Sequence, residues 1–339
     1  MDENISAEKA ASKQHGSLFA AVMRWMGLQN SELLLLLLAL SLIWVAAFSS
    51  TKIIRGGYDL GVKSELTTLL QSTDEAIHLW SHEKKSIAEN LASDTEILGL
   101  TQELLQNPRD QQALLASPAQ QMVRRLFQSF LKGGTLRGFF IIAPDNISLA
   151  SSRDINVGTL NLLTSQSDTM EKMWRGEVVM SRVQLSDVPM PKQREIAVGT
   201  RDLNMFVGAP IRDTSGKIIA LLTLRIDPNE TLFSLLHQAR LGETGEAYIF
   251  DRQGLMLSPS RFRDELVSMG LIEPDQSSVA RVYVRDNRVN RNSGLNRMAA
   301  SATLGEQASN VSGYPDYRGK KVVGAWKWEQ ELDLGLAVE

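Results

Sequence analysis

One uninterrupted apolar run near the N-terminus constrains the fold more than any other feature. Leu33–Phe48 reads LLLLLLALSLIWVAAF, and the uncharged stretch around it extends to Thr51. As a helix, the 19 residues of Leu33–Thr51 would extend roughly 28 Å, about the thickness of the hydrocarbon core of a bilayer. A core helix of a soluble protein shows a polar face, and this run has none. We therefore predict a transmembrane helix over 33–51, preceded by a short tail over 1–32.

A cleaved signal peptide is the alternative interpretation of this run. The small residues Ala46 and Ala47 lie where a signal peptidase would cut. However, a signal peptide begins with a short basic region, whereas 32 residues of mixed character precede this run. The sequence thus favours a retained anchor over a cleaved leader.

Composition limits the function of the remaining chain. A hydrophobic content of 43% is enough for a true core, and 22% charged residues is ordinary for a soluble surface. The formal net charge of −3 argues against a protein built chiefly to bind nucleic acid. The chain has no cysteine, which excludes disulfides, thiolate nucleophiles and iron–sulfur clusters. No nucleic-acid partner and no cofactor are expected.

The segment after the apolar run predicts long helices. Thr51–Gln106 reads as helical almost throughout, and Asn107-Pro108 marks its end. Gln111–Leu131 continues as a second helix. Apolar residues recur at steps of three and four, which is typical of one buried stripe: Leu66, Leu70, Ile77, Trp80, Ile87, Leu91 and Leu98. Such a helix suits either a dimerising stalk or a long core helix.

Two later stretches share one design and predict a duplication. GFFIIAPDNISLASS (Gly138–Ser152) and EAYIFDRQGLMLSPS (Glu246–Ser260) each contain an apolar strand, a turn with aspartate, a second apolar strand and a closing serine. The strand–turn–strand pattern of Met205–Asp227 recurs in Tyr314–Glu339. We predict two similar α+β modules in tandem, joined by a helix over Thr231–Arg240.

These stretches resemble a double Cache sensor domain over about residues 51–339. The most specific parts are GETGEAYIFDRQGLMLSPSRF (Gly242–Phe262) and YPDYRGKKVVGAWKWEQELDLGLAVE (Tyr314–Glu339), which resemble the membrane-proximal module of receptor kinases. FFIIAPDNISLASSRDINVG and MFVGAPIRDTSGKIIALLTLRID resemble the membrane-distal module.

The resemblance implies a complete architecture of the α+β class. It consists of one N-terminal transmembrane helix, a long stalk helix, and two tandem PAS-like modules with antiparallel sheets. The expected parts are a cytoplasmic tail (1–32), the transmembrane helix (33–51), long N-terminal helices (52–131), a membrane-distal Cache module (132–230) and a membrane-proximal Cache module (231–339).

The resemblance also implies a function and a location. The chain is expected to be the periplasmic or extracellular sensor of a receptor in the bacterial inner membrane, to form a homodimer, and to bind a small polar ligand in its membrane-distal module. A sensor histidine kinase is the expected output, and the chain is expected to be a fragment that stops before a second membrane helix. A chemoreceptor, nucleotide cyclase or Ser/Thr kinase output stays open. The competing classes are a membrane-anchored exported enzyme and a protein-binding module without signalling output.

The expected ligand-binding residues are Asp227, Arg225, Arg182 and Ser181. Arg225 and Asp227 lie two residues apart at the end of the most strand-like stretch, so both would project from one face. The resemblance implies that an aspartate in the place of Asp227 receives the amino group of a ligand. The alternative is that Asp227-Pro228-Asn229-Glu230 begins a helix, with Asp227 as its N-cap.

Other candidate sites have simpler explanations. His78 and His82 share one face of a helix, but the two side chains alone do not complete a metal site, and none is expected. The segment with Arg281, Arg285, Arg288, Arg291 and Arg297 has only Tyr283 as an aromatic residue, so a solvated segment is favoured over a nucleic-acid patch. No combination of nucleophile, base and acid predicts an active site within this chain.

Overall fold

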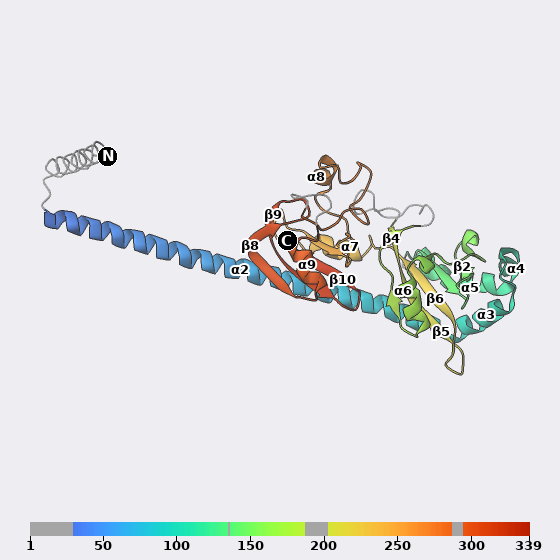
Figure 1. The fold of residues 1–339 in the computed structure, drawn as a ribbon. Helices are drawn as coiled ribbons and strands as arrows, with labels where there is room; N and C mark the ends of the chain where they lie inside the picture. Colours follow the sequence, from blue (N-terminus) through green and yellow to red (C-terminus); the bar gives the residue numbers. More distant parts are fainter. Residues whose placement is uncertain (1–29, 135, 187–202, 287–293) are drawn as a thin grey trace, which may run out of the picture. The chain divides into compact units, whose positions relative to one another are not determined.

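The computed structural model of the chain describes residues 30–134, 136–186, 203–286 and 294–339 (Figure 1). The predicted tail before residue 30 and the centre of the arginine-rich segment, with Arg288 and Arg291, lie outside these ranges. The chain forms two compact units, Met1–Val62 and Lys63–Glu339.

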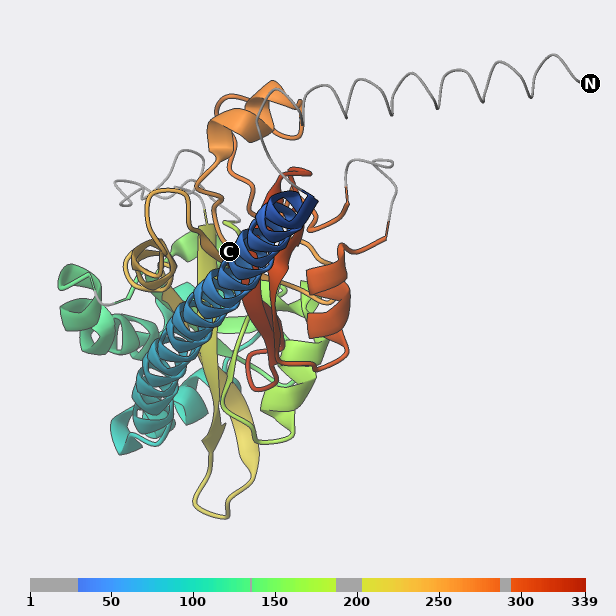
Figure 2. The ribbon, with the colours of Figure 1, turned by 90° about the vertical axis from the view of Figure 1, so that its left-hand side faces the viewer.

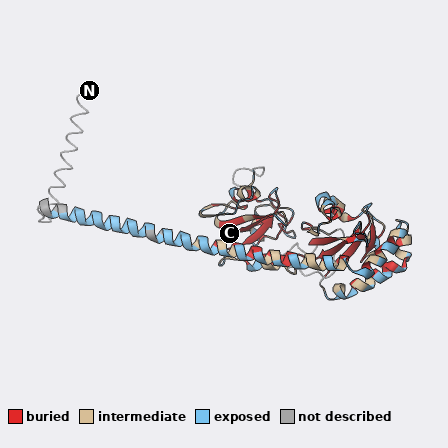
Figure 3. Cartoon of the chain, turned by 90° about the horizontal axis from the view of Figure 1, so that it is seen from below, coloured by how far each residue is buried: buried red, intermediate tan, exposed pale blue. Residues whose placement is uncertain are grey.

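The first described element, α2 (Asn30–Ala92), begins with the apolar run. Its described apolar side chains are exposed, with 67% for Leu35 and 74% for Trp44, as the pale blue start of this helix shows (Figure 3). Within the described residues it is the one helix long and apolar enough to cross a membrane. Exposed apolar surface of this extent suits a lipid environment better than water.

The later part of α2 buries the predicted apolar stripe. Leu66, Leu70, Ile77 and Trp80 are all 5% exposed or less. The helix ends earlier than expected, because Asp94 begins a new one. Its Oδ1 accepts hydrogen bonds from the backbone N–H groups of the first turn of α3 (Thr95–Gln106).

The predicted second helix is also divided. It consists of α4 (Gln111–Ala116) and α5 (Pro118–Lys132), with Ser117 between them. Pro118 occupies the first turn of α5, where its missing N–H costs nothing. The expectation of one continuous helix over 111–131 was therefore wrong at Ser117-Pro118.

The first sheet is antiparallel, in the order β2-β1-β6-β5-β3, with β4 also paired to β5. Its strands are β1 (Gly138–Ile142), β2 (Ser148–Ser151), β3 (Val179–Met180), β4 (Gln184–Leu185), β5 (Leu203–Arg212) and β6 (Ile218–Ile226). The 3-10 helices η1 (Asp154–Asn156) and η2 (Leu162–Ser165) precede α6 (Ser167–Trp174), which packs on this sheet.

The second sheet is separate from the first and has the order β7-β10-β9-β8. Its red C-terminal strands lie beside α2 (Figure 2). Its strands are β7 (Ala247–Phe250), β8 (Ala308–Pro315), β9 (Lys321–Glu329) and β10 (Leu334–Val338). The helices of this part are α7 (Leu232–Gln238), α8 (Arg263–Ser268) and α9 (Arg297–Thr303). The helix α7 matches the connecting helix predicted from the sequence.

The two sheets repeat one topology, because β1-β6-β5-β3 corresponds to β7-β10-β9-β8. Their turns also share one chemistry. In each, an aspartate Oδ1 accepts a hydrogen bond from the backbone N–H two residues later, which fixes a tight turn: Asp145, Asp213, Asp251 and Asp316. The α+β class with a long N-terminal helix and two antiparallel sheets is confirmed.

Candidate ligand-binding site

One row of residues crosses the first sheet and contains two of the predicted ligand-binding residues. Arg225 of β6 pairs with Gly138 of β1 on one side and with Phe206 of β5 on the other. Ser181, just after β3, continues the row, because its N–H donates to Phe206 O at 2.7 Å and its Oγ accepts from Phe206 N at 2.8 Å. The structure thus places Ser181 and Arg225 in one row, with Phe206 between them.

The guanidinium of Arg225 is held between aromatic rings inside the protein. Arg225 is only 2% exposed. Its Cζ lies 5.2 Å from the ring centroid of Phe206 and 5.7 Å from that of Phe140, and its Nη1 donates to Ser186 Oγ at 3.3 Å. Aromatic faces stabilise a cation in this position, and a guanidinium can also bind a carboxylate through two parallel N–H groups.

Two further polar side chains share the face of Arg225. Thr223 is two residues before Arg225 on β6, and Asn204 is two residues before Phe206 on β5, so alternation places them on this face. Both residues are fully buried. Thr223 Oγ1 and both side-chain polar atoms of Asn204 have no hydrogen-bond partner within the described parts of the chain. Unsatisfied buried polar atoms are costly, and a bound polar molecule would satisfy them.

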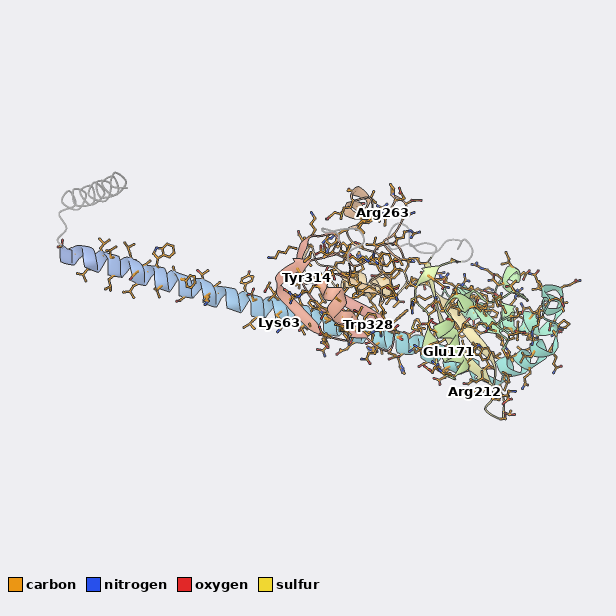
Figure 4. The ribbon with its side chains drawn as sticks, in the orientation of Figure 1. Lys63, Glu171, Arg212, Arg263, Tyr314 and Trp328 are labelled. Atoms are coloured by element: carbon orange, nitrogen blue, oxygen red, sulfur yellow. The ribbon has the colours of Figure 1, made fainter. Side chains whose placement is uncertain are left out.

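The helix α6 covers the neighbouring part of this face. Met170 and Met173 of α6 pack with Phe140 and Phe206 in one apolar cluster. The approach is close because Gly208 of β5 has no side chain, and a Cβ at this position would overlap with Met173 Sδ. Figure 4 shows α6, marked by Glu171, against the strands that end near Arg212.

Asp227 lies beyond the end of β6 and has structural partners. Its Oδ1 accepts from Asn229 N at 2.9 Å and from Asn229 Nδ2 at 3.0 Å, and its Oδ2 lies 3.5 Å from Arg137 Nη2. Because α7 begins later, with Thr231 as its N-cap, Asp227 fixes a turn ahead of the helix rather than the helix itself. Its contact with a ligand stays a prediction.

Arg182 lies at the surface. Its guanidinium pairs with Asp168 at 3.3 Å, and both side chains are exposed. Its backbone N–H donates to Gln166 Oε1 at 3.1 Å. A role of Arg182 in ligand binding also stays a prediction.

The second sheet has residues in the places equivalent to Arg225 and Gly138. The turns that follow β1 and β7 align Ile142 with Phe250. Ile142 pairs with Leu221 in the first sheet, and Phe250 pairs with Gly335 in the second. Counting four residues along each strand from these pairs aligns Gly138 with Glu246 and Arg225 with Glu339. Glu246 and Glu339 exchange backbone hydrogen bonds of 2.9 and 2.8 Å, as expected for a pair in the ladder.

In the second sheet, tyrosine side chains occupy these places. Tyr317 Oη donates to Glu246 Oε2 at 2.6 Å, and Tyr314 Oη donates to Glu339 Oε1 at 2.8 Å. Burial raises the pKa of Glu246, although the bond from Tyr317 opposes this shift. The carboxyl groups at the equivalent place in the second sheet thus have hydrogen-bond partners within the protein.

A cluster of possible metal ligands joins α2 to β9. Single ligand atoms of Asp74, His78 and Glu329 lie within 4.8 Å of one another. Lys327 supplies a positive charge at this place, because its Nζ lies 2.6 Å from Asp74 Oδ2 and 3.7 Å from Glu329 Oε2. We interpret the cluster as an ion-pair network, and His78 Nε2 joins it at 2.7 Å from Glu329 Oε2.

No family model matches this sequence. No curated protein matches it either. Several solved structures are similar to the chain, at low sequence identity.

The sensor domain of the histidine kinase DctB from V. cholerae has a TM-score of 0.48 and 11% identity, over 82% of this chain and 96% of that one. The extracellular domain of the putative histidine kinase mmHK1S-Z2 has a TM-score of 0.47 and 11% identity, over 81% of this chain and 95% of that one. The ligand-binding domain of the amino acid chemoreceptor PctB from Pseudomonas aeruginosa PAO1 was solved in complex with L-Arg. It has a TM-score of 0.46 and 14% identity, over 82% of this chain and 87% of that one.

Several residues of this face were missed by the sequence analysis. Phe140, Phe206, Thr223 and Asn204 belong to apolar strands, and nothing in their local pattern distinguishes them from core residues. Their role depends on the pairing of β1, β6 and β5, which brings together segments far apart in the chain.

Proposed function

We propose that this chain senses a small polar molecule outside the cytoplasm, as part of a transmembrane signalling receptor. The ligand would bind on the face of the first sheet that carries Arg225, Thr223 and Asn204. We propose that this sheet belongs to a membrane-distal module (132–230), and that the second sheet belongs to a membrane-proximal module (231–339).

The observation that carries this proposal is the difference between two equivalent places. In the second sheet the hydroxyls of Tyr314 and Tyr317 donate to Glu339 and Glu246, so the carboxyl groups at this place have hydrogen-bond partners within the protein. In the first sheet the same place carries the cation Arg225, next to buried polar atoms of Thr223 and Asn204 that have no partner in the described structure. A ligand with an acidic group for Arg225 and a second polar group for Thr223 fits this arrangement.

The contacts of α2 offer a route by which binding could be transmitted. Trp80 of α2 is 5% exposed and lines a cavity of about 20 Å³ together with Met205 of β5 and Leu334 of β10. A cavity of this size holds no more than a water molecule, so a movement of either sheet would press on Trp80. Because α2 contacts strands of both sheets here, it can respond to their relative movement.

Two ion pairs to the second sheet strengthen this link. Asp74 pairs with Lys327 at 2.6 Å, and Lys85 pairs with Glu331 at 2.6 Å. They join α2 to β9 and the turn that follows it. A shift of α2 would therefore be accompanied by a shift of β9.

We further propose that the output is a sensor histidine kinase, based on the resemblance of Gly242–Phe262 and Tyr314–Glu339 to receptor kinases. The chain would be anchored in the bacterial inner membrane by 33–51, with 1–32 in the cytoplasm and the sensor on the outer side. A homodimer would form through the stalk.

A ligand screen on the 339-residue chain in detergent tests the proposal. Amino acids, dicarboxylic acids and hydroxy acids are added separately, and unfolding is followed by tryptophan fluorescence. A ligand at about 100 times its dissociation constant adds roughly 2.7 kcal/mol of stability, a melting shift of several degrees. The shift should disappear in Arg225→Gln and persist in Arg175→Gln, a surface arginine that pairs with Glu171 and Glu177.

If no compound shifts the melting curve, or if the Arg225→Gln variant responds like the wild type, the proposed sensing site is wrong. In that case the anchored enzyme and the protein-binding module would remain as candidate functions.

A further inference from the structure

A second cavity lies beside the second sheet, away from the Arg225 face. It has a volume of about 450 Å³, within the range of small-molecule pockets. Three segments line it: α7 and the residues just after it, the start of β7, and the chain from Pro259 to the first turn of α8. None of the predicted ligand-binding residues lies in this cavity.

Basic side chains from these segments converge in the cavity. His237 and Arg240 come from α7 and its C-terminal end, and Arg261 and Arg263 come from the chain around the start of α8. Figure 4 labels Arg263 on α8. Burial lowers the pKa of both His237 and Arg240. The charges of Arg240 and Arg261 lower the pKa of His237 further, and the charge of Arg261 lowers that of Arg240, where Glu246 acts in the opposite direction.

Arg240 and Arg261 have no carboxylate partner within 4 Å in the described structure. Arg240 Nη2 is buried and makes no hydrogen bond to any residue that the structure describes. A basic residue after a helix often donates to its last carbonyls, but Arg240 Nη2 makes no such bond. The guanidinium of Arg261 is held by a backbone oxygen, because Nη1 donates to Gly245 O at 2.8 Å.

The two carboxyl groups that line the cavity are already engaged. Glu246 accepts from Tyr317 Oη and from Arg261 N, both at 2.6 Å. Asp264 pairs with Arg263 at 2.9 Å, and its side chain is 97% exposed. The cavity therefore keeps an excess of positive charge at Arg240 and Arg261.

The remaining wall is apolar. Phe233 and Leu236 of α7 face the cavity together with Ala247 and Pro259. A bare inorganic anion would leave this apolar surface without a partner. Because Phe233 and Leu236 are only 1% and 3% exposed, an anion with a hydrophobic body would gain mainly from close contact with these side chains.

We propose that this cavity binds a small organic anion, with its carboxylate or phosphate group between Arg240 and Arg261 and its apolar body against Phe233 and Leu236. A charged acceptor satisfies Arg240 Nη2 and separates two like charges that repel each other. This site is distinct from the ligand site proposed above, so the module that contains the second sheet would respond to a chemical signal of its own.

Benzoate and phenyl phosphate test this proposal on the 339-residue chain in detergent, with tryptophan fluorescence as the readout of unfolding. Both carry an acidic group on an apolar ring. The anion that gives the larger melting shift identifies whether a carboxylate or a phosphate is preferred. Benzyl alcohol and sodium chloride at equal ionic strength are the controls for the ring alone and for charge screening. We expect a melting shift of several degrees with at least one of the two anions and with neither control.

Substitutions assign the shift to this cavity. Arg240→Gln and Arg261→Gln should each weaken the apparent affinity at least about tenfold. Without an anion, Arg240→Gln should melt at or above the wild-type temperature, because it removes one of two repelling charges. Arg175→Gln and Arg225→Gln should keep the full response, which separates this site from the proposed sensing site.

Three results would overturn the proposal. The first is the absence of a shift with both aromatic anions. The second is an unchanged response in Arg240→Gln and Arg261→Gln. The third is an equal shift with inorganic phosphate, which would show that the apolar wall takes no part in binding.

Discussion

Arg225 of β6 and Glu339, the residue after β10, hold equivalent places in two sheets of the same topology. The first is a cation between two aromatic rings, and the second is a carboxylate bonded to Tyr314. The equivalent places of the two sheets thus differ in their chemistry, and burial raises the pKa of Glu339 to about 8. Glu339 has a hydrogen-bond partner within the protein, whereas the face of Arg225 keeps buried polar atoms at Thr223 and Asn204 without partners in the described structure.

Thr223→Val should separate stability from binding. The hydroxyl has no partner in the described structure, so replacing it with a methyl group of similar size should leave the free energy of unfolding unchanged or raise it by about 1 kcal/mol. If the hydroxyl binds the ligand, affinity should fall about tenfold. Denaturant unfolding and calorimetric titration measure the two effects. A loss of stability together with normal affinity would show that the hydroxyl is structural.

Asp227→Asn should keep the response to ligand. Asparagine retains the Oδ1 acceptor for the N–H of Asn229 and loses only the weak contact with Arg137, so we expect a loss of less than about 1 kcal/mol. The melting shift with ligand, compared with that of the wild type, is the measurement. A normal melting temperature with no response would instead establish Asp227 as a ligand contact.

The link between α2 and β9 can be measured with Asp74 and Lys327. The two side chains are only 12% and 21% exposed, so removal of either charge leaves the other poorly solvated. Asp74→Asn and Lys327→Met should each cost about 1–3 kcal/mol, and the double variant should cost less than their sum. Denaturant unfolding of the four proteins gives the coupling energy. Strict additivity would mean that this ion pair does not hold α2 to the sheet.

Glu246 should make stability depend on pH. Burial raises its pKa in the folded protein above the ordinary value of 4.5, so the folded state binds a proton more tightly than the unfolded state. Stability should therefore decrease as the pH rises above 4.5 and level off once the folded carboxyl has ionised. Across this range, the melting temperature should change less with pH in Glu246→Gln than in the wild type. An equal slope in both proteins would assign the pH dependence to other groups.

Strands and turns were predictable because their signals are local. Met205–Asp227 was predicted as strand–turn–strand, and it contains most of β5 and all of β6 with the turn of Asp213 between them. The similarity of Gly138–Ser152 to Glu246–Ser260 also anticipated the repeated topology. These features depend on a few neighbouring residues, which a single sequence displays directly.

Helix ends and sites were harder to predict because they depend on competition and on distant segments. Asp94 was read as part of the stalk, but its carboxylate satisfies two N–H groups and begins α3. Ser117-Pro118 was read within a helix, although it divides α4 from α5. Arg240 and Arg261 are 21 positions apart in the sequence, and only the packing of α7 against the chain near α8 brings them together.

A crystal structure of the complex with the strongest compound from the ligand screen tests the central claim most directly. We predict that the ligand lies on the face of the first sheet, with an acidic group bound by the guanidinium of Arg225 and a second polar group within hydrogen-bond distance of Thr223 Oγ1. A ligand bound elsewhere, with Arg225 still packed between Phe140 and Phe206 and Thr223 Oγ1 still without a partner, would contradict it.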